Sequence, residues 1–440
     1  MYAMELPDRV RKERYFDPDF YRLEAELLWP RVWQMACRLE EIPQPGDFVE
    51  YEILDQSIIV LRTDDLGVRA FQNACRHRGV RIVEGRGSCE TGFTCPFHGW
   101  CYGLDGKNTA VTRARTFSEH NLQPEDINLV SVRCEEWGGC VWINLDDDAP
   151  PLRQCIEPFA TTMEAWKLES MRAEWWYAFR LPVNWKLAQE AFVEQYHVLQ
   201  THPQLRIPGR YPPRDGSFDP QVFIESELHY LRTMSEGMAG MVHAKDVRIA
   251  EQLKDMELPA DPVLARLTWD RTLNDAVTSW HRDAGSVIPD LNELDVSGMN
   301  EPMGYCFPHF FVLPMYSSAS SYRFRPLGPE ETLMEIWSLT RFPEGSEPDR
   351  LPPPDPWECG DPRVPPIPTQ DFSNLPRQQK GLHARGFEYM RLSEQLEGHI
   401  SNYQRTIDGF LAGLPYEKLL PALRAINVNP LDMPVVDIGL

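Results

Sequence analysis

The segments Asn73-Ala-Cys75-Arg-His77-Arg-Gly79 and Cys95-Pro-Phe-His98-Gly99-Trp100 decide which kind of domain the first part of the chain contains. One residue separates Cys75 from His77, and two residues separate Cys95 from His98. In a chain with only ten cysteines among 440 residues, closely spaced cysteines and histidines are more often metal ligands than disulfide partners. The sequence therefore predicts that Cys75, His77, Cys95 and His98 hold one metal centre.

Two kinds of metal centre take two cysteines and two histidines. A structural zinc site favours a pair of cysteines followed by a pair of histidines, whereas each pair here is mixed. A Rieske-type [2Fe–2S] cluster places two thiolates on one iron and two imidazoles on the other, which raises its reduction potential above that of an all-cysteine cluster. The mixed pairs favour the [2Fe–2S] cluster, and the zinc site is the alternative.

A second group of candidate ligands lies in the segment Glu194-Gln-Tyr-His197-Val-Leu-Gln-Thr-His202-Pro203. Glu194 and His197 are three residues apart, so they share a face if the segment is helical. Pro203 disfavours the helical conformation at His202. We therefore expect the helix to end near Thr201 and His202 to turn toward His197. Two histidines with one carboxylate form the facial triad typical of non-haem Fe(II) sites; the alternative is two unrelated histidines in a core.

The carboxylate of this triad has to come from elsewhere in the chain. The acidic candidates are Asp361, Asp371, Glu388 and Glu397. Asp371 is preferred because it stands where a proline-dense segment is expected to enter a helix, so that its side chain can project into a site. The alternative interpretation of Asp371 is a helix N-cap.

The residue patterns predict an α+β chain in three parts. Residues 1–33 are expected to form a helical segment that packs on the third part. Residues 34–150 carry short apolar segments broken by glycine turns, which predict an antiparallel β domain. Residues 151–440 mix helices with antiparallel strands and predict a sheet surrounded by helices. The strands are expected at 48–54, 57–62, 68–71, 140–145, 307–313, 318–326 and 332–341.

Three further expectations concern residues 151–440. Helices are expected over residues 187–199 and, as one or two long helices, over 371–411. The proline-dense segment 343–368 is expected to be a loop without regular structure. A binding pocket is expected to be walled by Phe192, Val193 and the strands within 305–325.

Composition excludes some partners. The net charge of −22 argues against nucleic acid, since phosphate binding needs a basic surface. No apolar run reaches the length of a membrane span, so we expect no membrane partner. The segment from Met1 to Lys12 is polar and lacks the apolar region of a secretory signal, which favours a cytoplasmic protein.

Together the motifs resemble the large, catalytic subunit of Rieske aromatic-ring-hydroxylating oxygenases, over nearly the whole chain. The shared features are the two Cys/His pairs, the Asn184-Trp-Lys segment, the acid-x2-His-x4-His run and a late Gln370-Asp371 before a glutamine-rich helix. The resemblance implies a Rieske domain at 34–150 with a [2Fe–2S] cluster. It also implies a catalytic domain at 151–440 with a mononuclear Fe(II) held by His197, His202 and Asp371.

The resemblance further implies how the two metal sites cooperate. Members of the family are trimers in which a carboxylate joins an iron histidine to a cluster histidine of the next subunit. By its position this residue is Glu194, between His197 and the partner subunit's His98. Most members have aspartate there, and the glutamate is similar to members that act on quaternary amines. Ala191 also replaces the asparagine of the family's Glu-Asn-Phe motif.

The expected function is that of a terminal oxygenase component that uses O2 to mono- or cis-dihydroxylate an apolar, aromatic or polycyclic small molecule. NAD(P)H would act only indirectly, through a separate reductase and in some systems a ferredoxin, on a homotrimer or an α3β3 assembly. One alternative is a monooxygenase or N/O-demethylase acting on a quaternary amine or methoxy compound. A non-enzymatic alternative is a Rieske electron-transfer protein, which would lack the mononuclear iron.

Overall fold

The chain forms two compact units in a computed structural model that describes residues 2–211, 217–238, 241–301, 303–428 and 433–440. The smaller unit is Leu23–Cys155, and the larger unit combines Met1–Arg22 with Ile156–Leu440. The sequence places the domain boundaries after residues 33 and 150, whereas the compact units change after residues 22 and 155. Residues 23–33 lie in the smaller unit, where the Gln34 side-chain amide donates to the Trp29 carbonyl (2.7 Å) and the Trp33 indole donates to the Pro150 carbonyl (2.9 Å).

A seven-stranded antiparallel sheet forms the framework of the smaller unit, in the order β2-β11-β10-β5-β4-β3-β6. The expected strands at 48–54, 57–62, 68–71 and 140–145 are confirmed as β3, β4, β5 and β11. A second sheet, in the order β7-β8-β9, shares the apolar core of this unit. The bounds are β2 Gln34–Arg38, β3 Asp47–Ile53, β4 Gln56–Arg62, β5 Val68–Gln72, β6 Arg86–Ser88, β7 Phe93–Thr94, β8 Cys101–Tyr102, β9 Asn108–Ala110, β10 Ser131–Trp137 and β11 Cys140–Asn144.

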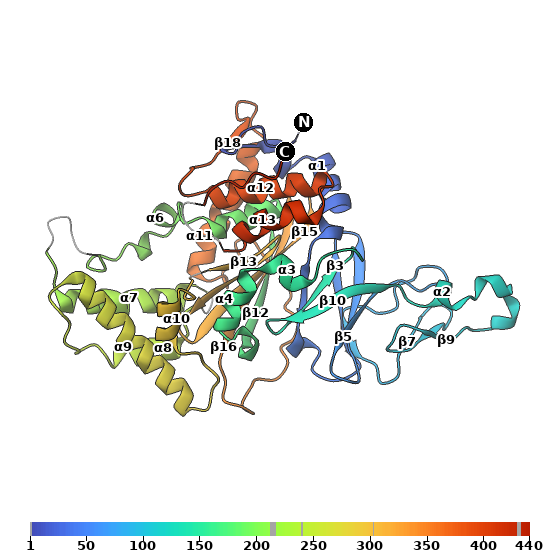
Figure 1. Cartoon of the computed structure of the whole chain (residues 1–440), viewed down its shortest axis with the longest axis horizontal. Coiled ribbons are helices and arrows are strands. Elements are labelled where there is room, and N and C mark those ends of the chain that lie inside the picture. Colours follow the sequence, from blue (N-terminus) through green and yellow to red (C-terminus); the bar gives the residue numbers. More distant parts are fainter. Residues whose placement is uncertain (1, 212–216, 239–240, 302, 429–432) are drawn as a thin grey trace. The chain divides into compact units, whose positions relative to one another are not determined.

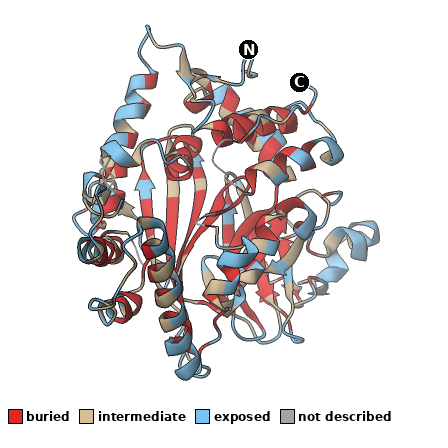
Figure 2. Cartoon of the chain, turned by 60° about the vertical axis from the view of Figure 1, so that its left-hand side comes forward, coloured by how far each residue is buried: buried red, intermediate tan, exposed pale blue. Residues whose placement is uncertain are grey.

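The larger unit is built on a six-stranded sheet in the order β13-β14-β15-β16-β12-β17. Neighbouring strands are antiparallel except for β17, which runs parallel to β12. The three strands expected between residues 307 and 341 are confirmed as β14, β15 and β16. The bounds are β12 Arg172–Leu181, β13 Gly304–Cys306, β14 Phe310–Met315, β15 Ser318–Gly328, β16 Glu331–Thr340 and β17 Trp357–Glu358. Most residues of β13 to β16 are buried (Figure 2), whereas β12 has four buried residues out of ten.

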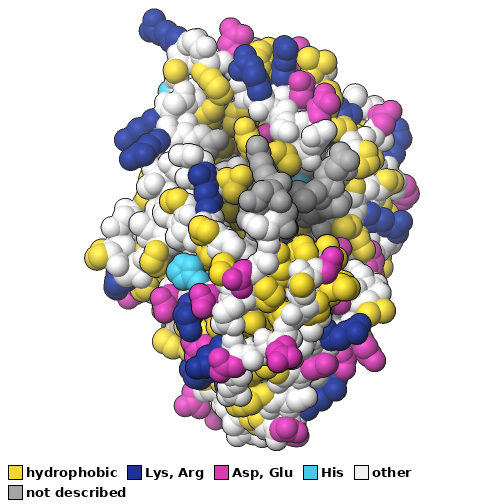
Figure 3. Space-filling view, turned by 90° about the vertical axis from the view of Figure 1, so that its left-hand side faces the viewer, with side chains coloured by type: hydrophobic (Ala, Val, Ile, Leu, Met, Phe, Trp, Pro, Cys, Tyr) yellow, Lys and Arg dark blue, Asp and Glu magenta, His cyan; other side chains and the backbone are white. Residues whose placement is uncertain are grey.

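Helices cover this sheet, as the sequence predicts (Figure 1). They are α4 Phe159–Ala165, α5 Trp185–Val193, α6 Val198–Thr201, α7 Pro220–Gly237, α8 Ala244–Glu251, α9 Pro262–Asp283, α10 Leu291–Ser297, α11 Pro366–Leu382, α12 Gly398–Leu411 and α13 Tyr416–Ile426. The side that carries α7 to α10 faces the viewer in Figure 3, and α9 exposes Val263, Leu264 and Leu267 to solvent. Among the described residues, no helix combines the length and the apolar character needed to cross a bilayer.

The N-terminal residues are part of the larger unit. β1 (Arg9–Arg11) pairs with β18 (Tyr389–Arg391), and α1 (Pro18–Leu23) follows. Val10 and Tyr15 pack in one apolar cluster with Leu187 of α5 and Leu382 of α11. The start of the chain therefore packs on α5, which leads into Glu194, and on α11, which carries Asp371.

Two expectations about local structure are wrong. The expected helix 187–199 is broken: α5 ends at Val193, Glu194 is extended (φ −104°, ψ 137°) and α6 begins at Val198. The break is stabilised because the Glu194 carboxylate accepts a hydrogen bond from the His197 backbone N–H (2.9 Å). The segment 343–368 is also partly regular, since it contains β17 and enters α11 at Pro366, where the first turn of a helix tolerates proline.

Candidate metal centres

The two Cys/His loops of the smaller unit have the same backbone design. The first follows β5 and the second joins β7 to β8. In the first, the Gly79 N–H donates to the Cys75 carbonyl (2.8 Å), and in the second the Gly99 N–H donates to the Cys95 carbonyl (3.0 Å). Both glycines are left-handed, with φ of +74° and +71°, a conformation that favours glycine. Each loop therefore turns its cysteine and its histidine to the same side.

These loops bring the four predicted cluster ligands together. Nδ1 of His77 lies 3.1 Å from Nδ1 of His98. Cys75 lies beside Cys95, and burial raises the pKa of the Cys75 thiol, so a thiolate there needs a cationic partner. Two thiols and two imidazole nitrogens that converge in this way fit the two ends of a [2Fe–2S] cluster.

Aromatic side chains surround the two histidines unequally. His77 stacks on the buried Trp100, with ring centroids 5.1 Å apart and planes 9° apart. His98 packs instead against Phe97 (3.9 Å), whose side chain is 55% exposed. Both imidazoles are half-buried, but Trp100 covers one face of His77, whereas His98 lies beside the exposed Phe97.

Tyr102 is a functional candidate that the sequence reasoning missed. Its hydroxyl lies 3.2 Å from the Cys75 sulfur and accepts a hydrogen bond from the Arg76 backbone N–H (3.0 Å). Because the Tyr102 oxygen accepts this hydrogen bond, the hydroxyl proton remains available to donate to the Cys75 sulfur. Hydrogen bonds to ligating sulfurs tune the reduction potential of an iron–sulfur cluster. The position of Tyr102 in β8, directly after the second Cys/His loop, is a local signal that could have identified this residue.

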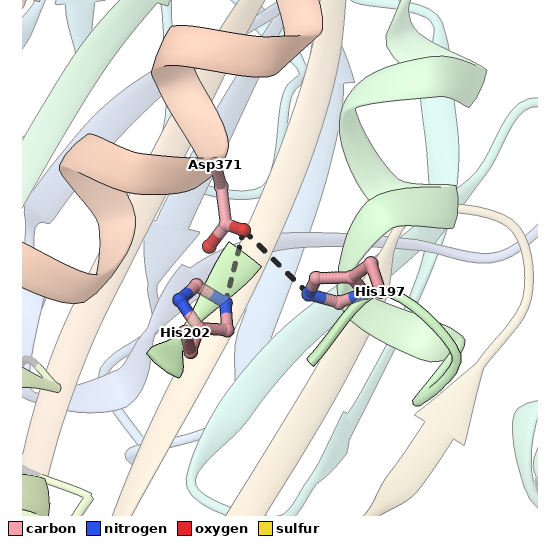
Figure 4. Close-up of side chains that lie close together, drawn as sticks. All are labelled: His197, His202 and Asp371. Carbon is pink, nitrogen blue, oxygen red and sulfur yellow. Dashed lines mark ion pairs between the residues drawn. The ribbon is translucent and has the colours of Figure 1, made fainter. Parts of the chain in front are cut away.

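In the larger unit, His197, His202 and Asp371 form a group of possible metal ligands whose donor atoms all lie within 4.8 Å of one another (Figure 4). Oδ1 of Asp371 is 3.2 Å from Nε2 of His202 and 3.6 Å from Nε2 of His197. Atoms about 3 to 4 Å apart are spaced as ligands that bind one ion at about 2.1 Å. Two imidazoles and one carboxylate fit a facial-triad iron. Asp371 lies inside α11 rather than at its N-terminus, so the N-cap alternative is excluded.

Hydrogen bonds on the far nitrogens orient both histidines. Nδ1 of His197 meets Oε1 of Glu194 at 2.8 Å, and Nδ1 of His202 meets Oε1 of Gln370 at 2.7 Å. Both partners are oxygens that accept, so each Nδ1 carries the proton and each Nε2 keeps its lone pair for a metal. The Gln204 amide holds Gln370 in place (2.8 Å). Gln370 and Gln204 were not predicted as site residues.

The electrostatics of this site favour a cation. Burial disfavours the charged form of His197, but the hydrogen bond and charge of Glu194 and the charge of Asp371 outweigh it and raise the pKa of His197. Burial likewise disfavours the charged form of His202, but the hydrogen bond and the charge of Asp371 outweigh it and raise the pKa of His202. A site that holds a proton this firmly also attracts a metal ion.

The other acidic candidates stay outside this group. Asp361 is a half-buried partner of the exposed Arg363 (2.7 Å), and Glu388 is exposed. Glu397 lines a cleft of about 480 Å³ together with Glu194, His197 and Asp371. α5, α11 and α12 form the walls of this cleft with residues 387–392.

The same cleft contains a buried acid that the sequence reasoning did not single out as a functional residue, Glu190. The Tyr15 hydroxyl donates to its carboxylate (3.1 Å), and the Gln404 amide donates to Oε1 (2.6 Å). Burial raises the pKa of Glu190 to about 7, against these hydrogen bonds and the charge of Lys186. Tyr15 and Gln404 are 175 and 214 residues from Glu190 in the sequence, so no local pattern reveals the contacts.

Two protein-family models match the chain. "Rieske [2Fe-2S] domain" matches residues 32–122, and "Ring hydroxylating alpha subunit (catalytic domain)" matches residues 161–413, more than half of the chain. The chain belongs to the ring-hydroxylating alpha-subunit family. The resemblance inferred from the motifs and the α+β fold class are thereby confirmed. The cofactors of a Rieske ring-hydroxylating alpha subunit are a [2Fe–2S] cluster and a mononuclear iron, as the motifs predict.

Relatives of this alpha subunit have diverse names. The carnitine monooxygenase oxygenase subunit of Escherichia coli (strain K12) is 30% identical over 191 residues, which are 43% of this chain and 50% of the relative. The anthranilate 1,2-dioxygenase large subunit of Acinetobacter baylyi (strain ATCC 33305 / BD413 / ADP1) is 31% identical over 205 residues, 44% of this chain and 42% of the relative. The chain thus spans about half the length of the curated relatives it matches.

Solved structures confirm the fold of the alpha subunit. A quaternary ammonium Rieske monooxygenase with a bound inhibitor matches with a TM-score of 0.61 at 17% identity, over 93% of this chain and 99% of that chain. Naphthalene 1,2-dioxygenase with bound indole also matches with a TM-score of 0.61 at 17% identity, over 97% and 98%.

Proposed function

We propose that this alpha subunit is the terminal oxygenase of a Rieske non-haem iron system, an oxidoreductase that hydroxylates a small molecule. The observation that carries the proposal is the convergence of His197, His202 and Asp371 in a chain that also carries a Cys75–His77–Cys95–His98 group. An electron carrier needs only the second of these groups.

Each site residue has a distinct proposed role. Cys75, His77, Cys95 and His98 hold the cluster, and His197, His202 and Asp371 hold the iron. When bound, the cluster would supply single electrons, and the iron would supply open coordination positions for O2. Monooxygenation consumes O2, two electrons and two protons and yields one hydroxyl group and water. cis-Dihydroxylation has the same demand but places both oxygen atoms on the substrate.

Glu194 is proposed to couple the two metal sites. Its carboxylate binds His197 (2.8 Å) and also lines the open cleft. The resemblance implies that a second copy of the chain approaches there with its own His98. The exposed Phe97, which packs on the half-buried His98, supports such an approach. A homotrimer follows, or an α3β3 assembly if a small subunit takes part. A separate reductase, with or without a ferredoxin, would supply electrons from NAD(P)H.

There are two candidate substrate classes. The family as a whole favours an aromatic or polycyclic ring compound. A quaternary amine or methoxy compound is the second candidate, because this chain has Glu194 where most members have aspartate, and because one relative is named for carnitine.

Nitric oxide tests the proposed iron site without knowledge of the substrate. NO binds Fe(II) at an open position in place of O2 and gives a high-spin (S = 3/2) EPR signal. We expect this signal in the reduced, Fe(II)-loaded protein and its loss in His197→Ala. The cluster signal of that variant should persist. If the loaded wild type lacks the NO signal, the oxygenase assignment fails.

A further inference from the structure

One face of the six-stranded sheet lies against α5, the helix that leads into Glu194. Phe192 of α5 packs on Phe311, Tyr322 and Phe324, with ring centroids 5.6 to 6.2 Å apart. Side chains alternate between the two faces of a strand, so Ser320 shares the face of Tyr322. Ser338 lies directly opposite Ser320 in the register and therefore shares that face too.

This face carries a row of buried hydroxyl groups. Ser338 and Thr340 are 0% and 2% exposed, and their hydroxyls have no hydrogen-bond partner among the described residues. The Tyr322 hydroxyl is buried next to Ser320 in the same row. A buried hydroxyl without a hydrogen-bond partner destabilises a fold, so these groups call for a partner such as a ligand or an ordered water.

The row lies close to the proposed iron site. Tyr322 packs on Phe192, two residues before Glu194, with ring centroids 5.6 Å apart. Phe179 of β12 lies opposite Met334 and so shares the face, and it packs on Phe372, the neighbour of Asp371 in α11 (5.1 Å). At the other end of the face, Ser318 anchors the chain before α8, because its hydroxyl donates to the Met241 carbonyl (3.2 Å) and accepts from the His243 N–H (3.0 Å). The hydroxyls thus stand between α5 and this anchored segment.

On β14 to β16 this face is polar but uncharged. Residues of this face on β14 to β16 are aromatic, aliphatic or hydroxyl-bearing, whereas the charged side chains of these strands, Arg323, Arg325 and Glu335, fall on the opposite face by alternation. Arg323 and Glu335 pair with each other there (2.7 Å). A ligand group on the hydroxyl face of these three strands therefore meets hydrogen-bonding groups without an ionic partner. Arg172 of the neighbouring β12 lies opposite Thr340 in the register, but its guanidinium donates to the Glu169 and Met171 carbonyls.

We propose that Ser338, Thr340 and Tyr322 bind a neutral oxygen substituent, a carbonyl or hydroxyl group, on a ring-shaped substrate. This inference rests on the proposed oxygenase function and narrows its substrate class. Hydroxyl groups donate to a carbonyl oxygen, and the Phe192–Tyr322 side of the face suits the ring. A bare hydrocarbon would leave the hydroxyls unpaired, and a site built for hydrogen bonds rejects a ligand that lacks them.

Matched ligand pairs test the proposal. The probes are 1-indanone against indene and acetophenone against ethylbenzene, titrated calorimetrically into the anaerobic, iron-loaded protein. We expect the ketone of at least one pair to bind about 10-fold or more tightly than its hydrocarbon. Ser338→Ala and Tyr322→Phe should bring the two affinities close together. Ser321→Ala is the control, since Ser321 is equally buried but faces the other side of the sheet.

Thermal unfolding separates ligand binding from a structural role. Ser338 has no hydrogen-bond partner within the described part of the chain, so Ser338→Ala should melt at or above the wild-type temperature while it loses the ketone preference. Equal affinity for ketone and hydrocarbon, or no binding by either ketone, overturns the inference. A lower melting temperature with an unchanged preference overturns it as well. The NO signal of the same samples shows whether the iron site itself is intact, so either failure is distinguishable from failure of the oxygenase assignment.

Discussion

The Glu194 carboxylate holds His197 by two hydrogen bonds, one from ring Nδ1 (2.8 Å) and one from the backbone N–H (2.9 Å). The second bond shapes the break between α5 and α6, and the first fixes which ring nitrogen faces Asp371. Glu194 therefore acts on the proposed iron site without being one of its ligands.

Removal of this carboxylate should uncouple the two metal sites. We expect Glu194→Ala and Glu194→Gln to lower substrate-dependent O2 consumption by about 100-fold, at the upper end of effects for residues that orient metal ligands. The optical spectrum of the cluster should not change. Glu397→Gln is the control, because Glu397 lines the same cleft but is not hydrogen-bonded to His197 in any contact described. Wild-type turnover in Glu194→Ala would contradict the coupling role.

Loss of the Asp371 carboxylate should empty one metal site only. In Asp371→Ala we expect the mononuclear iron to be lost, because two imidazoles without the carboxylate bind Fe(II) poorly. Iron analysis should show a fall of one iron per chain with unchanged acid-labile sulfide. Asp361→Ala, which removes an acid outside the site that pairs with Arg363, should keep the full complement of iron. Retention of all iron in Asp371→Ala would exclude Asp371 as a ligand.

Tyr102 should raise the reduction potential of the cluster. A hydrogen bond to the Cys75 sulfur (3.2 Å) stabilises the reduced state, which carries one more negative charge. Tyr102→Phe should lower the midpoint potential by on the order of 50 mV in a spectroelectrochemical titration. Tyr51→Phe removes a buried tyrosine that bonds Gln34 instead and should leave the potential unchanged. An unchanged potential in Tyr102→Phe would show that the hydroxyl does not donate to the sulfur.

Glu190 should make stability depend on pH. Its pKa is raised to about 7 in the folded chain, so the folded state holds a proton that the unfolded state has already released. The stabilisation is complete below the unfolded pKa of about 4.5 and is lost as the pH rises through 7, by about 3 kcal/mol in all.

Thermal unfolding at pH 5.5 and pH 8 checks this assignment. The wild type should lose more stability than Glu190→Gln over this interval, because glutamine keeps hydrogen bonds but does not titrate. Glu331→Gln, at a surface pair with Arg180, should follow the wild type. Parallel behaviour of wild type and Glu190→Gln would place the titrating group elsewhere.

The cluster ligands were predictable because their signal is local. Each Cys/His pair lies within four residues, and the strands around it follow clear apolar patterns. β12 was missed because its segment, Arg172–Leu181, mixes charged and apolar residues without strict alternation.

The iron site was predictable only in part. The three-residue spacing correctly predicted that Glu194 and His197 lie close together. It predicted this from a continuous helix, whereas the structure has a break after Val193. Asp371 came from its place after the proline-dense segment and from the family resemblance. The contact of Gln370 with His202 spans 168 residues, and such tertiary contacts have no signature in a single sequence.

The stoichiometry of iron and acid-labile sulfide in anaerobically purified, Fe(II)-reconstituted protein tests the central claim most directly. The two proposed sites predict three irons and two sulfides per chain, with a red-brown colour that bleaches on reduction by dithionite. Two irons with two sulfides would contradict the mononuclear site, and a colourless protein that holds zinc would contradict the cluster as well.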